Sequence, residues 1–383
     1  MRVSRRGAER VAAGHLWIYA SDVTDRGEAQ PGDAAKILDW KGRALGTAHY
    51  SSTSQICLRF LSGQVEAIDS EFFLRRLAAA REHRQRVVSG TEAYRLVHAE
   101  GDLLPALIVD RYGDYLVIQT LDQGMDRAKG DIVGALKRLF APRGIVERND
   151  AAVRKREDLP LQTGVLAGDA PDQVQVRMND LQFTVDLLGG QKTGLYLDQR
   201  ENYLAAMRYA RGQALDCFTF SGGFALQLAA RCEAVEAVDS SPAALALAEA
   251  NRRLNHIENV TFREANVFDL LSGYLAGGRR FSTIVLDPPG FARSRQALAA
   301  ATRGYKEINY RSLRLLEPGG VLVTCSCSQH LSEAEFLEIV ASAALDAGRR
   351  LRVLERRTQA RDHPILLTVP ETHYLKCLIL EVL

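Results

Sequence analysis

Residues 215–224, with the sequence LDCFTFSGGF, predict a strand that ends in a tight glycine turn and runs directly into a helix. Glycine at such a turn lets a ligand approach the backbone, and the start of the helix offers free N–H groups. The turn lacks the three-glycine dinucleotide fingerprint, so plain packing of a strand on a helix is the alternative. The neighbouring sequence has to decide between the two.

The chain around this turn alternates between apolar strand-like runs and longer helical runs. The runs lie at 214–218, 224–231, 234–238, 243–254, 281–286, 305–315, 321–325 and 333–347. Such alternation with short connections is typical of a doubly wound α/β sheet. Residues 374–383 form a last apolar run, which we expect to be a closing strand.

Polar residues follow successive strands of this predicted sheet. Asp239 ends the second strand, where an acidic side chain can bind ribose hydroxyls, and Asn266 follows the third, where it could reach an adenine edge. The fourth strand ends in Asp287-Pro288-Pro289-Gly290-Phe291. Taken singly, Gly222 and Gly223 could be only a turn, Asp239 a helix cap and Asn266 a loop residue. In this order, at the ligand-binding edge of an open sheet, they predict an adenosine-type cofactor.

Two further stretches of the sequence resemble motifs of one particular protein family. They are Gly189-Gly190-Gln191-Lys192-Thr193-Gly194-Leu195-Tyr196-Leu197-Asp198-Gln199-Arg200 and Thr324-Cys325-Ser326-Cys327-Ser328. Together with the glycine turn, Asp239 and the Asp-Pro-Pro-Gly-Phe stretch, they resemble the ribosomal RNA large subunit methyltransferase I family, which makes 5-methylcytosine in 23S ribosomal RNA. The likeness covers nearly the whole chain, including His15-Leu16-Trp17-Ile18-Tyr19 and Arg111-Tyr112-Gly113-Asp114.

The resemblance implies a fold, a cofactor and a site. The fold would be α/β, with a Rossmann-like class I methyltransferase domain preceded by a small β-barrel (PUA) domain and a small α/β middle domain. The cofactor would be S-adenosylmethionine, bound by Asp216, Phe218, Ser221, Gly222, Gly223, Asp239, Asn266, Asp287, Thr193 and Gln199. The implied RNA-binding residues are Lys192, Arg200, Pro288 and Phe291.

The N-terminal sequence agrees with this domain order. Short apolar runs such as 34–39 and 56–61 predict a β-rich domain over 1–68, after which Asp69 caps a helix. A hairpin at 104–119 and a helix at 126–140 predict a small α/β domain within 69–173, and 174–383 would form the methyltransferase domain. The helix after Asp69 carries arginines that form either a solvated face or an RNA-contacting one: Arg75, Arg76, Arg81 and Arg84.

The chemistry of cytosine C5 explains why a cysteine matters. C5 is a poor nucleophile, and addition of a thiolate to C6 converts the ring into an enamine that can accept a methyl group at C5. Cys325 and Cys327 would point to the same side of one strand. Cys327 lies nearer the carboxyl edge and matches the family's Ser-Cys-Ser motif, so we predict it as the nucleophile. Cys325 and the remaining cysteines are expected to be packing residues.

A base must also remove the C5 proton. Many other cytosine-C5 RNA methyltransferases carry a second cysteine after the fourth strand, where this chain has Pro288-Pro289-Gly290 instead. Asp287 is the candidate base, although it could merely orient the loop. His363 could carry a proton, but a lone loop histidine is more often structural. Asp198 could likewise serve only as a helix cap.

Two other functions compete with this prediction. A guanine-N2 RNA methyltransferase would use a similar domain and an Asp-Pro-Pro-x-Phe motif but needs no covalent nucleophile, so Cys327 separates the two. An RNA-binding assembly factor without catalysis would not need Asp216, Asp239, Asp287 and Cys327 together. RNA, as 23S ribosomal RNA or a large-subunit precursor, is the expected partner in both cases.

Composition sets wider limits. The 383 residues are 46% hydrophobic and 25% charged with a net charge of +2, a balance typical of globular proteins. No stretch is apolar enough to span a bilayer, and no apolar segment follows the basic N-terminus as in a signal peptide. The six cysteines lack zinc-ligand spacing, so we expect no metal and a reducing, cytoplasmic location. A homodimer is left open.

Overall fold

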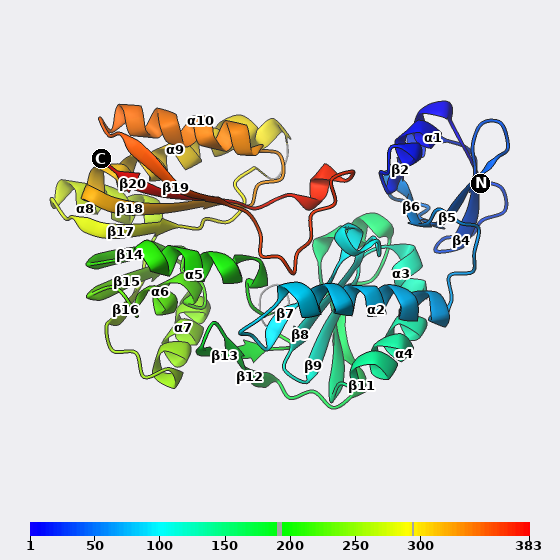
Figure 1. Ribbon diagram of the computed structural model, residues 1–383, viewed down its shortest axis with the longest axis horizontal. Coiled ribbons are helices and arrows are strands. Elements are labelled where there is room, and N and C mark those ends of the chain that lie inside the picture. The colour runs from blue at the N-terminus through cyan, green and yellow to red at the C-terminus, as the bar shows by residue number, and fades with distance from the viewer. Residues whose placement is uncertain (190–193, 293–294) are drawn as a thin grey trace. The chain divides into compact units, whose positions relative to one another are not determined.

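The computed structural model describes residues 1–189, 194–292 and 295–383 (Figure 1). The chain forms two compact units. The first comprises Met1–Arg177, Val185–Leu197 and Arg361–Thr372, and the second comprises Met178–Thr184, Asp198–Ala360 and His373–Leu383. Among the helices that the structure describes, none is both long enough and apolar enough to cross a membrane.

The first unit begins with a six-stranded sheet in the order β2-β6-β5-β4-β1-β3. Its elements are β1 (Arg2–Val3), α1 (Arg5–Ala12), β2 (Trp17–Tyr19), β3 (Val23–Asp25), β4 (Ala34–Leu38), β5 (Ala44–Tyr50) and β6 (Ile56–Ser62). Ile18, Ile37 and Leu58 are fully buried in its core. Strands β4 and β6 match the two that the sequence predicted.

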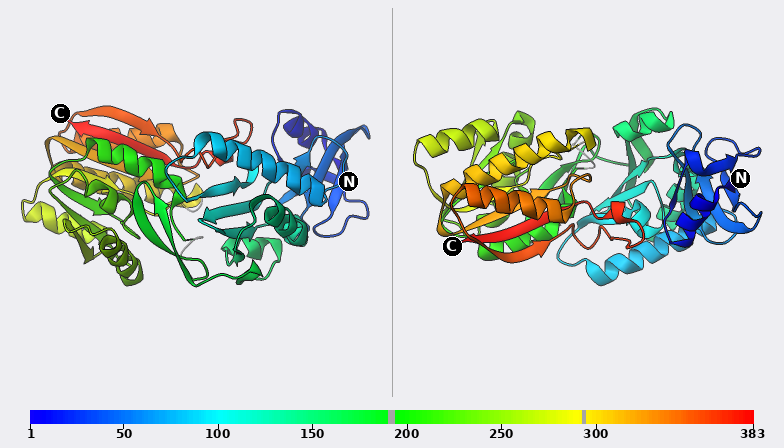
Figure 2. Two further views of the ribbon diagram at one scale, coloured as in Figure 1. Left: turned by 60° about the horizontal axis from the view of Figure 1, so that its bottom comes forward. Right: turned by 90° about the horizontal axis from the view of Figure 1, so that it is seen from above.

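The second part of this unit is a five-stranded sheet in the order β11-β10-β9-β8-β7 (Figure 2). Its elements are α2 (Ser70–Val87), β7 (Ala93–His98), β8 (Leu107–Tyr112), β9 (Tyr115–Thr120), α3 (Gln123–Arg127), α4 (Lys129–Phe140), β10 (Gly144–Asn149) and β11 (Gln162–Gly168). Asp69 caps α2 as predicted, since its side chain accepts the Phe72 N–H at 3.0 Å. Phe72, Phe73 and Leu77 of α2 join the core beneath this sheet.

The arginines of α2 differ from one another in burial. Arg84 is only 2% exposed, and its Nη2 donates to Asp102 Oδ2 and to the Asp362 carbonyl, each at 2.7 Å. Arg84 therefore belongs neither to a solvated face nor to an RNA-contacting one, and both sequence interpretations are wrong for it. By contrast, the side chain of Arg75 is 60% exposed and pairs with Glu66.

The second unit is built on a seven-stranded sheet in the order β16-β15-β14-β17-β18-β20-β19. The first five strands run parallel, while β20 lies antiparallel between β18 and β19. The strands are β14 (Gln213–Cys217), β15 (Ala234–Asp239), β16 (Val260–Glu264), β17 (Phe281–Leu286), β18 (Leu316–Ser326), β19 (Leu351–Arg357) and β20 (Lys376–Val382). A two-stranded hairpin, β12 (Gln173–Met178) and β13 (Leu181–Asp186), precedes it.

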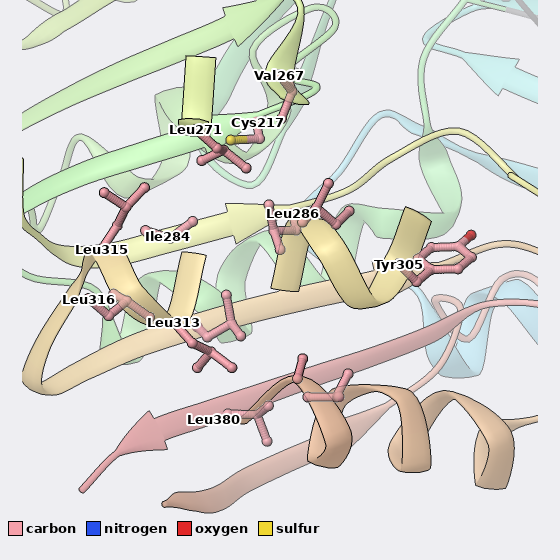
Figure 3. Close-up of a cluster of buried hydrophobic side chains, with 14 of the residues drawn as sticks. Cys217, Val267, Leu271, Ile284, Leu286, Tyr305, Leu313, Leu315, Leu316 and Leu380 are labelled. Atoms are coloured by element: carbon pink, nitrogen blue, oxygen red, sulfur yellow. The ribbon is translucent and has the colours of Figure 1, made fainter. Parts of the chain in front are cut away.

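Helices cover both faces of this sheet, as expected for a doubly wound domain (Figures 1 and 2). They are α5 (Arg200–Tyr209), α6 (Gly223–Leu228) and α7 (Pro242–Leu254) on one face, and α8 (Val267–Ala276), α9 (Leu298–Leu315) and α10 (Glu333–Asp346) on the other. Figure 3 shows part of the core under the second group, which includes Leu286 of β17, Leu313 of α9 and Leu380 of β20. Each such buried leucine contributes about 1.5–3 kcal/mol.

Two features of this unit differ from the sequence prediction. Strand β19 was not predicted, because its run Leu-Arg-Val-Leu-Glu-Arg-Arg carries charges that suit a solvent-facing edge strand. Strand β18 ends at Ser326, so Cys327 lies one residue beyond it. The expectation that Cys325 and Cys327 share one strand is therefore wrong.

Candidate active site

The glycine turn after β14 holds an unusual backbone. Phe218 and Phe220 have φ angles of +66° and +51°, and Gly222 has +88°. Non-glycine residues rarely adopt this left-handed conformation, and when they do they cluster at functional sites. At Gly223 an added Cβ would lie 2.5 Å from the Tyr203 ring, so only glycine fits there. The turn thus presents backbone rather than side chains at the end of β14.

Asp216 lies buried directly beneath this turn. Its Oδ2 accepts hydrogen bonds from Thr219 Oγ1 at 2.6 Å and from the Ala225 N–H at 3.0 Å. Within the part of the chain that the structure describes, its Oδ1 is buried and has no partner. Burial raises the pKa of Asp216 to about 7, the hydrogen bond from Thr219 opposes this, and the charge of Asp287 adds to it. The glycine turn is therefore supported by the Asp216 carboxyl group, whose Oδ1 accepts no hydrogen bond from the described residues.

Asp239 and Asn266 occupy the edge positions that the sequence predicted. Asp239 is half-buried, and its two oxygens accept the N–H groups of Phe220 and Ser241, each at 2.9 Å. Helix α7 is capped by Ser241, so Asp239 is not the helix cap that was its alternative reading. Asn266 does cap α8 by accepting the Phe268 N–H. Asp239 therefore ties the second strand end to the glycine turn.

Asp287 directly follows β17 and is held by a relay of amide side chains. Its Oδ1 accepts a hydrogen bond from Gln199 Nε2 at 2.9 Å. Asn202 Nδ2 donates to Gln199 Oε1 at 2.7 Å, and Arg357 Nε donates to Asn202 Oδ1 at 2.8 Å. Gln199 and Asn202 are buried, with exposures of 2% and 0%. The amide orientation of Gln199 is thereby fixed with its N–H toward the carboxylate.

Cys327 is the half-buried cysteine of this chain, and the other five cysteines are buried. Its Sγ lies 3.5 Å from the position of a Cβ built on Gly290, in the Asp-Pro-Pro-Gly-Phe loop. The Tyr305 hydroxyl binds both neighbouring serines, Ser326 Oγ at 3.0 Å and Ser328 Oγ at 3.0 Å. Two motifs that are far apart in the sequence therefore meet around one accessible sulfur.

The second cysteine of the motif has different surroundings. Cys325 is fully buried and lies opposite Cys377 across β18 and β20. Burial raises the pKa of the Cys325 thiol well above its ordinary value, and the hydrogen bond with Cys377 acts in the same direction. A neutral, buried thiol of this kind suits packing rather than attack on a substrate.

The remaining predicted residues fall into three groups. Lys192 and Thr193 lie outside the described residues. Pro288 is buried and Phe291 half-buried, with the Phe291 ring 4.7 Å from that of Tyr305. Asp198 does not cap α5, because its Oδ2 instead accepts the Tyr374 hydroxyl at 2.8 Å.

Arg200 and His363 are both buried in their units. Arg200 is 3% exposed and its guanidinium lies 3.7 Å from the Glu201 carboxylate, so its side chain is not solvated. His363 is 2% exposed in the first unit, with Nδ1 3.2 Å from Asp362 Oδ1 and its ring 5.0 Å from that of His98. The surroundings of His363 are those of a structural histidine.

Comparison with known proteins decides the family. A model of the PUA-like domain family matches residues 1–63, and a model of the S-adenosylmethionine-dependent methyltransferase family matches residues 150–379. The chain is 43% identical over 377 residues to ribosomal RNA large subunit methyltransferase I from Tolumonas auensis, covering 96% of this chain and 95% of that protein.

This chain belongs to the ribosomal RNA large subunit methyltransferase I family. A second member, from Klebsiella pneumoniae, is 41% identical over 371 residues and covers 94% of this chain and 93% of that protein. The PUA-like first domain and the Rossmann-like methyltransferase domain expected from the sequence are thus confirmed.

Solved structures agree on the fold of this family member. A chain described as a SAM-dependent methyltransferase from Streptococcus mutans superposes with a TM-score of 0.85 at 19% identity, covering 100% of this chain and 99% of that one. A methyltransferase solved as a complex with SAH superposes with a TM-score of 0.87 at 20% identity, with the same coverage.

S-adenosylmethionine is the cofactor of the methyltransferase family to which this chain belongs. The residues at the ends of β14 and β15 are suited to binding this cofactor. The left-handed turn at Gly222 offers backbone at close range, and the unpartnered Asp216 Oδ1 is a buried acceptor beneath it. The half-buried carboxylate of Asp239 stands at the next strand end, where carboxylates bind ribose.

Three residues around the site were missed by sequence reasoning. Asn202 orients Gln199, Tyr305 binds both serines beside Cys327, and Lys376 donates to the Ser328 carbonyl at 2.7 Å. Only Lys376 left a signal in the sequence. It is the single basic residue in the apolar run at 374–383, and a lysine there must either face solvent or bind a buried partner.

Proposed function

We propose that this chain methylates C5 of a cytosine in ribosomal RNA, most specifically 23S ribosomal RNA, with Cys327 as a covalent nucleophile. One observation carries the proposal: the half-buried sulfur of Cys327 lies against Gly290, beside the Asp287 loop at the cofactor edge of the sheet. A guanine-N2 methyltransferase has no use for a thiol at this position.

Two observations support RNA as the substrate. The 43%-identical relative is named a ribosomal RNA large subunit methyltransferase, and residues 1–63 match a PUA-like domain. The first helix of that domain carries Arg5 and Arg6, whose side chains are 74% and 69% exposed although each pairs with a carboxylate. Such arginines can add salt-dependent affinity for phosphate without sequence specificity.

We propose a cofactor site along four strand ends. Gly222, Gly223, Phe218 and Ser221 would provide the turn, Asp216 would support it, and Asp239 would bind the ribose hydroxyls. Asn266 and Gln199 complete the set, as Asp287 does at the fourth strand end. Pro288, Phe291 and Arg200 are proposed to border the RNA base.

The proposed reaction begins at Cys327. Its thiolate forms a bond to C6, and the electron pair of the C5–C6 double bond moves toward C5. Bound S-adenosylmethionine supplies the methyl group that C5 takes up. Asp287 then accepts the C5 proton, the C5–C6 double bond re-forms, and the C6–S bond breaks to return the thiolate. Gln199 donates to Asp287 Oδ1 at 2.9 Å and so holds the carboxylate that would take up this proton.

The experiment compares wild type with Cys327→Ala and Cys325→Ala. Each protein is incubated with S-adenosylmethionine and ribosomal RNA, either naked or in large-subunit particles, and nucleosides are identified by mass spectrometry. We expect 5-methylcytidine from wild type and from Cys325→Ala, and none from Cys327→Ala. Methylguanosine from all three proteins would instead indicate the guanine-N2 reaction, and cofactor binding without product on any RNA would indicate a non-catalytic assembly factor.

A second experiment tests the covalent step. In RNA that carries 5-fluorocytosine, C5 holds fluorine in place of the proton that the base must remove. We expect a denaturation-resistant protein–RNA adduct with wild type that requires S-adenosylmethionine and is absent with Cys327→Ala. Methylation of cytosine without such an adduct would contradict the nucleophilic role.

A further inference from the structure

Lys376 is a buried lysine next to the Ser-Cys-Ser motif. It is the first residue of β20, directly opposite Ser326, the last residue of β18. Its exposure is 3%, and its neighbours Leu375 and Cys377 are buried as well. Lysine is almost never buried unless a partner compensates its charge.

The ammonium group of Lys376 is anchored by two backbone carbonyls. Nζ donates to the Ser328 carbonyl at 2.7 Å and to the Tyr374 carbonyl at 2.8 Å. Ser328 is the residue after Cys327, so the ammonium group is held at the turn that carries the sulfur. Among the described residues, no carboxylate lies within ion-pair distance of Lys376.

Four other polar or charged groups that the structure describes near this turn are engaged in hydrogen bonds or ion pairs. Glu333 of α10 pairs with Arg356, and Glu335 of α10 accepts the backbone N–H and hydroxyl of Ser332 in the capping box. Asp287 of β17 accepts from Gln199. The Tyr305 hydroxyl of α9 binds Ser326 and Ser328.

The charge on Cys327 is coupled to Lys376. Burial lowers the pKa of Lys376 to about 8, and among the opposing influences the negative charge of a Cys327 thiolate comes first, ahead of Glu333 and Glu335. Coupling between two titrating groups is reciprocal. An ammonium group that is favoured by the thiolate must therefore favour the thiolate to the same extent.

We propose that Lys376 is a positioning residue for the nucleophile: its ammonium group, fixed by the Ser328 and Tyr374 carbonyls, keeps Cys327 ionised as a thiolate. The Cys327 proton leaves to water, and Lys376 stays an ammonium throughout. This inference rests on the proposed role of Cys327, and it adds the residue that makes that thiol reactive near neutral pH.

The test measures the ionisation of Cys327 without RNA. The rate of iodoacetamide alkylation of the Cys327 peptide is followed by mass spectrometry from pH 5.5 to 10 in wild type and in Lys376→Met. We expect a wild-type midpoint clearly below the usual thiol value of about 8.5. In Lys376→Met the midpoint should rise by about one unit, which leaves roughly tenfold less thiolate at pH 7.

Arg352→Met is the matched control, because Arg352 pairs with Glu381 at the far end of β20. It removes one positive charge roughly 17 Å along the strand from Lys376. This separation exceeds the Debye length of about 10 Å at 0.1 M salt, so the charge is largely screened. This variant should keep the wild-type midpoint. Lys376→Arg should keep most of the low midpoint, since it retains the charge.

Two results would overturn the proposal: a wild-type midpoint at or above about 8.5, or an unchanged midpoint in Lys376→Met. If Lys376→Met does not fold, the wild-type midpoint decides alone. Methylation by Lys376→Met should be weak at pH 7 and recover toward pH 9, whereas a merely structural loss would not recover. Failure of this proposal can be told apart from failure of the proposed nucleophile. If Cys327 is not the nucleophile, Lys376→Met still shifts the alkylation midpoint of Cys327, but methylation activity does not follow that shift.

Discussion

Gln199 donates a hydrogen bond of 2.9 Å to Asp287, across 88 residues of sequence. The contact joins the polar loop before α5 to the loop after β17. This hydrogen bond involves Oδ1 of the Asp287 carboxylate. Asn202 in turn fixes the orientation of the Gln199 side-chain amide that donates it.

Gln199→Leu should lower kcat/KM roughly 10- to 100-fold, because a hydrogen bond to a charged acceptor is lost. The uncompensated Asp287 is then easier to protonate, so the acid limb of the pH–rate profile should move to higher pH. Gln199→Glu should move it further, since a second negative charge opposes ionisation. The control is Gln227→Leu, a buried glutamine whose side chain donates to the Met207 sulfur. An acid limb that stays in place in both Gln199 variants would exclude Asp287 as the base.

Asp216→Asn should change how stability depends on pH. Burial raises the pKa of Asp216 to about 7 in the folded protein, above its ordinary value of 3.8. The stability that the protonated form contributes is therefore present below about pH 3.8 and is lost as pH rises toward 7. Relative to Asp216→Asn, wild type should lose on the order of a few kcal/mol between pH 4 and 7.

Chemical unfolding of both Asp216 proteins at several pH values checks this. Asp346→Asn is a suitable control, because the Asp346 side chain is 52% exposed. A constant difference between wild type and Asp216→Asn across the range would contradict the prediction.

His98→Gln should make the first unit less sensitive to acid. Burial lowers the pKa of His98 well below its ordinary value of 6.5, and the neighbouring His363 acts in the same direction. As pH falls below about 6.5 the unfolded chain binds a proton that the folded chain does not, so stability is lost. Each such histidine costs up to about 1.4 kcal/mol per pH unit. Urea unfolding from pH 7.5 to 5 should show a shallower loss in His98→Gln, and the same loss as wild type in the exposed-site control His373→Gln.

Arg84→Met should destabilise the protein by about 3–5 kcal/mol, because it leaves the carboxylate of Asp102 buried without its cation. Arg84 also donates to the Asp362 carbonyl, so the Arg361–Thr372 segment should loosen with it. Arg75→Met, on the same helix, removes an exposed ion pair with Glu66 and should cost below about 1 kcal/mol. Thermal unfolding of the two variants side by side measures the difference, and equal costs would contradict the burial argument.

Much of the fold could be predicted from local patterns in the sequence. The glycine turn at 215–224, the Asp69 cap and the alternating strands and helices follow from backbone conformation and hydrophobic periodicity, which depend on neighbours in sequence. The edge strand β19 was missed because its charged residues hide that periodicity. The arginines of α2 look alike in sequence, yet only the packing of β7 and of the Arg361–Thr372 segment distinguishes buried Arg84 from exposed Arg75.

Local patterns in the sequence were sufficient to predict the kind of domain, the family resemblance and the candidate residues Asp216, Asp239, Asp287 and Cys327. Their partners became visible only in the folded chain: Gln199 for Asp287, Gly290 and Tyr305 around the Cys327 motif, and Lys376 on the carbonyl of Ser328, the residue after Cys327. These contacts could not be predicted because they depend on strand order and register. Both are set when distant apolar faces pack together, and neither is written in the local order of residues.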